Sequence, residues 1–178
     1  MPSFDFRAVG RLTGTALSVV AYRNQARGFD PRSGEGARRL GGRFNPPQSI
    51  PVLYLCLTRP CVVAELTRRA ERQGLNIEAL LPSELFEVSA DLGRVIDLTG
   101  AETLDALGVA PPDLVREDHR LTQELGRAAH EHGFRAIRSP SAKGVGDILA
   151  IFPEKLAGAA LDVKRLGEWS TAADLARL

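Results

Sequence analysis

Three residues suited to ligand binding and charge stabilisation, Arg43, Tyr54 and Glu65, follow one another at intervals of eleven residues. An arginine fork binds phosphate groups through two parallel hydrogen bonds. Arg43 follows paired glycines that permit close backbone approach, Tyr54 interrupts an apolar run at 50–57, and Glu65 falls just after that run. Because the end of a strand and the start of the next helix are adjacent in space, this order predicts one shared pocket with Arg43 at its floor.

Each of the three also has a purely structural interpretation. Glu65 and Arg69 stand four residues apart, in the orientation that forms a surface ion pair on a helix. Tyr54 fits a core aromatic residue whose hydroxyl has a hydrogen-bond partner. Arg43 fits a guanidinium group that caps a loop carbonyl. Spacing alone leaves both interpretations open.

The elements expected to position these residues are a strand, an irregular segment, a second strand and a helix. Alternating apolar residues predict the strands, and the Gly-, Arg- and Pro-rich segment between them has the length of a binding loop. Thr58 is expected to cap the helix and Gly74 to end it. The expected ranges are a strand over 16–22, the irregular segment over 23–47, a strand over 50–57 and the helix over 58–73.

The remaining sequence predicts a mixed α+β domain with several strands and about four helices. A capping box is expected where Thr99 precedes Glu102 by three residues, and glycines follow the helices. The expected strands are 85–89 and 94–98, with an Asp-Leu-Gly turn between them, then 134–138 and 148–152. The expected helices are 99–107, about 118–132 and 171–178.

A chain of 178 residues with 44% hydrophobic and 25% charged residues is typical of one soluble globular domain. We expect a single domain over 1–178, with a core at about 16–155 and a C-terminal helical extension at about 165–178. The net charge of +1 argues against a protein that coats nucleic acid or anionic membrane. No apolar run approaches the ~20 residues of a membrane-spanning helix, and the first residues lack a signal-peptide pattern.

Cysteine and histidine usage predicts a cytoplasmic protein without a metal site. Cys56 and Cys61 lie in apolar surroundings and are expected to be buried, reduced thiols. The three histidines lack zinc-ligand spacing. The glycine pairs at 34–36 and 144–146 lack the remaining residues of a dinucleotide or P-loop fingerprint.

Basic residues are unevenly placed, since 20 of the 23 are arginines and six of these fall between Arg23 and Arg43 with only two acids. Ten acids and two arginines occupy 78–118. The near-neutral total therefore combines two surfaces of opposite charge.

The stretch 32–47, with Gly41-Gly42-Arg43-Phe44-Asn45, together with Val52-Leu-Tyr-Leu55 and Val63-Ala-Glu65, resembles the RES-domain family. This family supplies the toxins of bacterial Xre-RES toxin–antitoxin pairs. Its Gly-Gly-Arg-Trp-Asn arginine falls on Arg43, and Phe44 replaces the Trp. The positions that match the family's other site residues are Arg23 (followed by Asn24 where a close subgroup has an aromatic), Tyr54, Glu65 and Ser141, with Ser139 as the alternative serine.

The resemblance implies a fold similar to ADP-ribosyltransferase toxins, with a bent, split β-sheet and flanking helices. It implies NAD as substrate without a prosthetic group, cleavage of the nicotinamide–ribose bond, and inorganic phosphate or water as acceptor. Arg43, Tyr54 and Glu65 would be catalytic, and Arg23, Arg43, Tyr54 and Ser141 would bind NAD. A cognate antitoxin with a helix-turn-helix domain would form a hetero-oligomer with the toxin and cover its active site.

Two other functions remain open at this stage. The same pocket would serve an enzyme that transfers ADP-ribose to a host protein. A module that binds RNA or DNA through the arginine-rich segment belongs to another class, and the near-neutral charge and 6% aromatic content argue against it.

Overall fold

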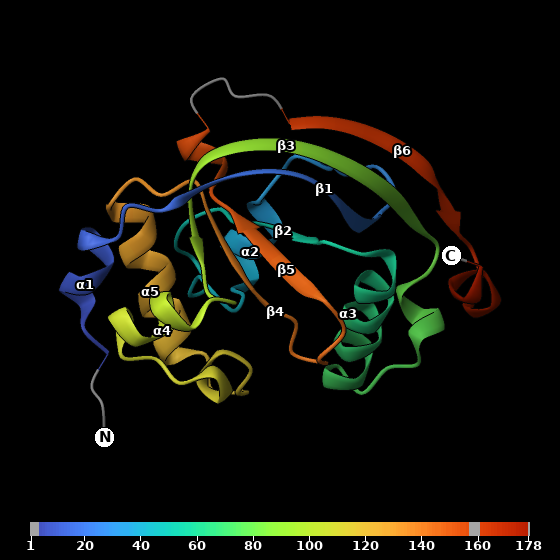
Figure 1. Ribbon diagram of the computed structural model, residues 1–178. Coiled ribbons are helices and arrows are strands. Elements are labelled where there is room, and N and C mark those ends of the chain that lie inside the picture. Colours follow the sequence, from blue (N-terminus) through green and yellow to red (C-terminus); the bar gives the residue numbers. More distant parts are fainter. Residues whose placement is uncertain (1–3, 157–160, 178) are drawn as a thin grey trace.

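A ring of hydrogen-bonded strands forms the centre of the computed structural model, which describes residues 4–156 and 161–177. Strands β1, β2, β5, β4 and β3 pair in that order, and β3 pairs back with β1, so that the ring closes. Only β3 and β4 run parallel to each other. The long strands β1, β3 and β6 arch over the shorter ones (Figure 1). The strands are β1 (Thr15–Ala26), β2 (Leu53–Cys56), β3 (Ser83–Asp97), β4 (Ala136–Pro140), β5 (Asp147–Ile151) and β6 (Leu161–Trp169).

Helix α3 lies at one end of this strand assembly and α1, α4 and α5 lie together at the other, whereas α2 lies toward the middle of the view (Figure 1). Short 3₁₀ turns connect several elements. The α-helices are α1 (Phe6–Arg11), α2 (Glu35–Leu40), α3 (Arg59–Arg72), α4 (Ala101–Leu107) and α5 (Arg120–Glu131). The 3₁₀ helices are η1 (Ile77–Leu80), η2 (Pro111–Leu114), η3 (Pro153–Lys155) and η4 (Ala172–Ala176).

Two apolar cores share the strands of the ring. Alternation along β2 sends Leu53 and Leu55 into the core inside the ring, where residues from β1, β3, β4 and β5 meet them. The neighbouring residues Val52 and Cys56 instead join the core between the sheet and the helices. Every second residue of a strand faces the same side, so both faces of β2 are buried and its sequence is almost continuously apolar.

Helix α3 begins and ends as its sequence predicts. The Thr58 hydroxyl accepts a hydrogen bond from the Cys61 backbone N–H at 3.3 Å. One face of the helix buries Cys61, Val62 and Leu66. Gly74 follows with a φ of 64°, a left-handed conformation that favours glycine.

Strand β3 corrects two of the predictions. The two strands expected over 85–89 and 94–98 are one continuous strand, and the expected Asp-Leu-Gly turn is wrong. Asp91 is exposed and Leu92 buried, so the alternation of a strand continues through this segment. The capping box is also wrong, because Gly100 occupies the N-cap of α4 and the Thr99 hydroxyl donates to Asp97 at 2.6 Å instead.

The C-terminal segment also differs from the expectation of a helical extension over about 165–178. Residues 165–169 belong to β6, which pairs antiparallel with β3. Only the short η4 remains of the helix expected over 171–178, whose last residue lies outside the described part of the chain. Between 23 and 47, β1 continues to Ala26 and α2 interrupts the irregular segment.

The other elements agree with the sequence to within a few residues. The helix expected over 118–132 is α5, and the strands expected over 134–138 and 148–152 are β4 and β5. None of the helices in the described ranges is long and apolar enough to cross a membrane.

Candidate active site

The loop that carries Arg43 is held by hydrogen bonds from its own backbone and from α5. The Gly42 backbone N–H donates to the Asn45 carbonyl at 2.8 Å. The Gln123 side chain of α5 donates to the carbonyls of Gly42 and Asn45, at 3.0 and 3.3 Å. Gly126 of the same helix packs so closely that a Cβ there would lie 1.8 Å from the Phe44 carbonyl oxygen. The loop is therefore fixed against α5 on one side.

Tyr54 fixes the other side of the same loop. Its hydroxyl donates to Asn45 Oδ1 at 2.9 Å and accepts from the Phe44 backbone N–H at 2.8 Å. Burial of this hydroxyl raises the pKa of Tyr54, so that the group stays neutral. Gly42 lies against the ring, where a Cβ would approach Tyr54 Oη to 2.7 Å. The hydroxyl is satisfied, as the structural interpretation of Tyr54 predicts.

Arg43 is buried, with 6% of its surface exposed. One of its Nη atoms donates to the Leu114 carbonyl, as the loop-cap interpretation predicts. Desolvation and the nearby Arg68 lower the pKa of Arg43, and the attraction of Glu65 opposes them. Among the described residues the hydrogen-bond partner of Arg43 is the Leu114 carbonyl. A guanidinium group has five N–H donors, so further donors remain for an anion.

Glu65 meets Ser141, a residue from the loop between β4 and β5. The Ser141 hydroxyl donates to Glu65 Oε1 at 2.9 Å, and Ser141 is only 1% exposed. The Ser141 hydroxyl in turn accepts from the Lys143 backbone N–H at 3.3 Å. The loop is also tied to α3 further along, where Lys143 Nζ pairs with Glu71 at 2.6 Å. Ser139, the alternative serine, has a buried hydroxyl that lies 3.5 Å from the Pro140 carbonyl and is not bonded to Glu65 among the described residues.

The ion pair expected between Glu65 and Arg69 does not form. Among the described residues, the hydrogen-bond partner of the Glu65 carboxylate is Ser141. Arg69 is exposed, and desolvation lowers its pKa. Glu65 is therefore directed toward the β4–β5 loop and away from a surface ion pair.

Arg23 lies near the junction between β2 and α3. Its neighbour Tyr22 pairs with Cys56, the last residue of β2. The Arg23 guanidinium donates to the carbonyls of Ser33 at 3.1 Å and Pro31 at 3.5 Å. Burial first, and then the repulsion of Arg69, lower the pKa of Arg23 to about 10. The structure thus links Tyr54 to the loop of Arg43 and Glu65 to Ser141 through hydrogen bonds, and Glu65 acts on Arg43 through its charge.

Sequence reasoning missed two polar residues that shape the site. Asn45 is fully buried, and its amide donates to the carbonyls of Ala37 and Ile50 at 2.7 and 3.3 Å. Gln123 ties the loop to α5, as described above. Asn45 could have been predicted as a loop residue, because it follows Arg43 within the Gly-Gly-Arg-Phe-Asn motif. Gln123 lies outside any motif, so the sequence gives no indication of its role.

The segment between η2 and α5 adds further groups beside Arg43. Glu117 pairs with Arg68 at 2.8 Å and with Arg72 at 3.7 Å. Desolvation, followed by repulsion from Arg43 and these two arginines, lowers the pKa of His119 below its usual value, so its imidazole is neutral at pH 7. Leu114, whose carbonyl accepts from Arg43, ends η2 just before this segment, and Glu117 of the segment pairs with two arginines of α3.

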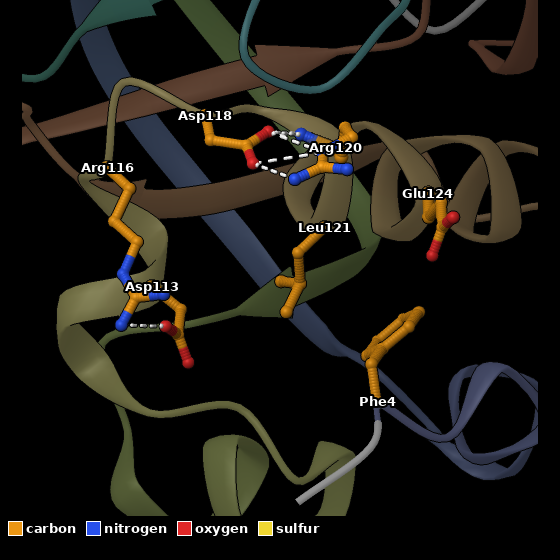
Figure 2. Close-up of a pocket in the computed structure, with 7 residues that line it drawn as sticks. All are labelled: Phe4, Asp113, Arg116, Asp118, Arg120, Leu121 and Glu124. Atoms are coloured by element: carbon orange, nitrogen blue, oxygen red, sulfur yellow. Dashed lines mark hydrogen bonds and ion pairs between the residues drawn. The ribbon is translucent and has the colours of Figure 1, made fainter. Parts of the chain in front are cut away.

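A separate surface hollow of about 300 Å³ lies between the N-terminal segment and the start of α5. Figure 2 shows that its arginines are already paired, Arg116 with Asp113 at 3.0 Å and Arg120 with Asp118 at 2.6 Å. None of the predicted site residues lines it. In the described ranges, no three His, Cys, Asp or Glu side chains cluster as metal ligands.

Two proteins with the same name in two mycobacterial species are similar to this chain in sequence. The protein named NAD(+) phosphorylase MbcT of Mycobacterium tuberculosis (strain H37Rv) is 31% identical over 140 residues, which cover 78% of this chain and 75% of the relative. The protein of the same name in Mycobacterium bovis matches with the same identity and coverage.

The fold is similar to a solved toxin structure. The crystal structure of the M. tuberculosis MbcT–MbcA toxin–antitoxin complex contains a chain that matches with a TM-score of 0.79 and 27% identity, over 97% of this chain and 95% of that chain. The predicted α+β fold with a sheet and flanking helices is confirmed. A family model described as "RES domain" matches residues 20–174. The chain belongs to the RES-domain family, as its motifs predict.

Proposed function

We propose that this protein is a toxin that depletes NAD by cleaving the bond between nicotinamide and ribose, with inorganic phosphate as the acceptor of ADP-ribose. The observation that carries the proposal is the contact of Ser141 with Glu65, beside the buried and incompletely bonded Arg43. The name NAD(+) phosphorylase of the mycobacterial relatives supports the same reaction.

In this reaction a phosphate oxygen forms a bond to C1′ of the nicotinamide ribose, and the C1′–N bond breaks. Nicotinamide leaves with the electron pair of that bond, and the ribose passes through a positively charged state. Glu65 is the carboxylate that stabilises this charge and holds the ribose 2′-hydroxyl. The Ser141 hydroxyl, which donates to Glu65 Oε1, sets the direction of the carboxylate. Ser141 therefore orients Glu65 and does not attack the substrate.

The arginines bind the phosphate groups. Within the described part of the chain Arg43 has N–H donors beyond its bond to Leu114, and the half-buried Arg23 uses one nitrogen for its carbonyl contacts at 3.1 and 3.5 Å. Both suit charge-assisted, bidentate bonds to phosphate oxygens. The half-buried ring of Tyr54 contacts the nicotinamide ring, while its hydroxyl holds the loop.

The partner and compartment follow from the same proposal. The structural neighbour is a toxin in complex with its antitoxin. For this chain we propose a cognate antitoxin that carries a helix-turn-helix domain and covers the residues around Glu65. Cys56 and Cys61 are both buried free thiols, which supports a reducing compartment such as the cytoplasm, where NAD is abundant.

The test is the release of nicotinamide from NAD by the purified protein, with and without inorganic phosphate. The variant Glu65→Gln keeps the shape of the side chain and removes its charge. We expect it to lower the rate by about two to three orders of magnitude. The matched control is Glu78→Gln, which removes an exposed carboxylate from the neighbouring η1.

The outcomes separate the possible acceptors. A rate that requires phosphate identifies phosphorolysis, and an equal rate without phosphate identifies hydrolysis. Isotope-labelled NAD incubated with host proteins would place the label on a protein if ADP-ribose is transferred there. An unchanged rate in Glu65→Gln contradicts the role of Glu65, and an inactive wild-type protein contradicts the function.

A further inference from the structure

Arg43 lies at the tip of a tight turn whose two ends are bridged. Gly42 and Asn45 form an isolated antiparallel bridge, and the Gly42 backbone N–H donates to the Asn45 carbonyl at 2.8 Å. Arg43 and Phe44 stand between them, and both are buried, Phe44 completely. The direction in which the Arg43 side chain leaves the main chain therefore depends on how this turn is held.

The side chain of Gln123 contacts both ends of the turn. Its amide nitrogen lies 3.0 Å from the Gly42 carbonyl oxygen and 3.3 Å from the Asn45 carbonyl oxygen. A side-chain amide has two N–H donors, and each of the two carbonyls takes one of them. Both N–H groups of Gln123 are therefore used to hold the turn, so their effect on a bound substrate passes through the turn.

The guanidinium end of Arg43 is held by the same stretch of chain. It donates to the carbonyl of Leu114, the last residue of η2, and α5 with Gln123 is the next helix along the chain. Gly126 lies on the same face of α5 as Gln123, because residues three apart on a helix are neighbours. A Cβ on Gly126 would meet the Phe44 carbonyl. One continuous segment, from η2 to α5, therefore holds both the main chain and the guanidinium group of Arg43.

We propose that Gln123 is a positioning residue for the phosphate-binding side chain of Arg43. A guanidinium fork binds phosphate oxygens through two parallel hydrogen bonds, so a rotation of the turn weakens this bond even where the charge of Arg43 is kept. The inference rests on the proposed function. It takes the ligand of Arg43 to be a phosphate group, either in the pyrophosphate of NAD or as the inorganic phosphate that accepts ADP-ribose.

The test measures initial rates of nicotinamide release with NAD and phosphate varied separately. Gln123→Met keeps the length of the side chain and removes both donors. We expect KM for one of the two substrates to rise roughly 10-fold, with kcat changed less than about threefold, because the lost hydrogen bonds act on binding by Arg43. A higher KM for NAD identifies its pyrophosphate as the ligand, and a higher KM for phosphate identifies the acceptor.

A merely structural role of Gln123 gives a different result. A variant that is only less stable has fewer active molecules, so its apparent kcat falls while both KM values stay as in the wild type. A second readout comes from the background Arg43→Lys, which keeps the charge and loses the fork. There Gln123→Met should change KM by less than about twofold, because the two residues act together. A full rise of KM in both backgrounds, or a lower kcat with unchanged KM, overturns the proposal.

The matched control is Gln73→Met, which makes the same substitution at the exposed C-cap of α3. It should leave both KM values within about twofold of the wild type, because the Gln73 side chain is exposed at the end of α3 and the Gln123 side chain holds the turn. If Gln73→Met and Gln123→Met raise KM alike, the effect is not specific to the turn and the proposal is overturned.

Calorimetric titration with ADP-ribose and with inorganic phosphate measures binding without turnover. Gln123→Met should weaken the binding of one of them roughly 10-fold. Equal affinities and equal KM values in variant and wild type overturn the role of Gln123. A wild-type protein that binds ADP-ribose but releases no nicotinamide contradicts the proposed function, and weaker binding by Gln123→Met still supports the positioning of Arg43. A wild-type protein that binds neither compound contradicts both.

Discussion

Ser139 and Ser141 are both buried, yet their hydroxyl groups have different surroundings. Ser141 donates to Glu65 at 2.9 Å, whereas Ser139 reaches only the Pro140 carbonyl at 3.5 Å. A hydrogen bond to a charged group contributes about 1.5–3 kcal/mol. The carboxylate that we propose as catalytic therefore accepts from a hydroxyl that lies 76 residues later in the chain.

We expect Ser141→Ala to lower the rate of nicotinamide release about tenfold or more, because Glu65 loses the bond that orients it. The control Ser139→Ala removes a hydroxyl of equal burial and should retain most of the activity. Urea unfolding of both variants separates a loss of orientation from a loss of stability. Equal activities of the two variants would contradict the assignment of Ser141.

Tyr54 illustrates how a single residue combines a structural and a proposed functional role. Its hydroxyl holds Phe44 and Asn45, and its ring lies against Gly42. The sequence predicts that Tyr54 belongs to the site, but not that its hydroxyl is committed to the loop. The hydrogen bonds depend on how the loop folds back over β2, and no spacing rule contains that information.

Helices α2 and α5 each contain one glycine, and the two differ in what surrounds them. Gly126 of α5 lies against the carbonyl of Phe44, and Gly36 of α2 has open space where a Cβ would be. Glycine within a helix usually costs stability relative to alanine, by about 1 kcal/mol. At Gly126 the glycine is needed despite this cost, because a side chain there would prevent α5 from packing closely against the loop of Arg43.

We therefore expect opposite results from the same substitution in the two helices. Gly126→Ala places a Cβ 1.8 Å from an oxygen atom, so the helix must move. Overpacking of this kind costs about 1–3 kcal/mol, and the displaced loop should also lower the rate of nicotinamide release. Gly36→Ala should leave the rate unchanged and raise the free energy of unfolding by less than about 1 kcal/mol. Urea unfolding and initial rates check both, and a neutral Gly126→Ala would contradict the close packing.

The elements that the sequence predicts well are those with local signals. Thr58 and Gly74 delimit α3 correctly because capping depends on residues within one turn of each end. The turn expected in β3 is wrong because Asp-Leu-Gly is also compatible with a strand whose exposed residues are Asp91 and Gly93. Strand β6 was missed because it covers the edge of β3 and its burial does not alternate regularly.

Strands whose side chains pack into two apolar cores, one on each face of the sheet, hold the whole molecule together. Leu53 and Leu55 of β2 contribute to the core inside the ring, and Val52 and Cys56 contribute to the core beneath the helices. Neither core can lose its packing without disturbing the other. The family match over residues 20–174 spans both of them.

We expect the chain to unfold as one cooperative unit. Trp169, the only tryptophan, is 5% exposed at the end of β6, where it reports on an edge of the assembly. Its fluorescence and the far-ultraviolet circular dichroism should give the same midpoint in urea. Two different midpoints would indicate separately folding parts and contradict a single domain.

The sequence predicted which candidate site residues follow one another along the chain, but it did not predict the contacts between them. Arg43, Tyr54 and Glu65 were recognisable from motif and spacing. The contact of Ser141 with Glu65 was not, because the rule for residues four apart predicts an ion pair of Glu65 with Arg69 instead. Contacts between distant segments decide which of two locally reasonable arrangements forms.

The bracing of the Arg43 loop has a consequence for how quickly the toxin acts. Gln123, Tyr54 and the Leu114 carbonyl hold the loop within the chain itself, without help from a partner. A toxin built in this way needs no folding step after its antitoxin leaves. Under the proposed function we therefore expect NAD loss in the cell to begin as the antitoxin dissociates or is degraded, without a lag for folding.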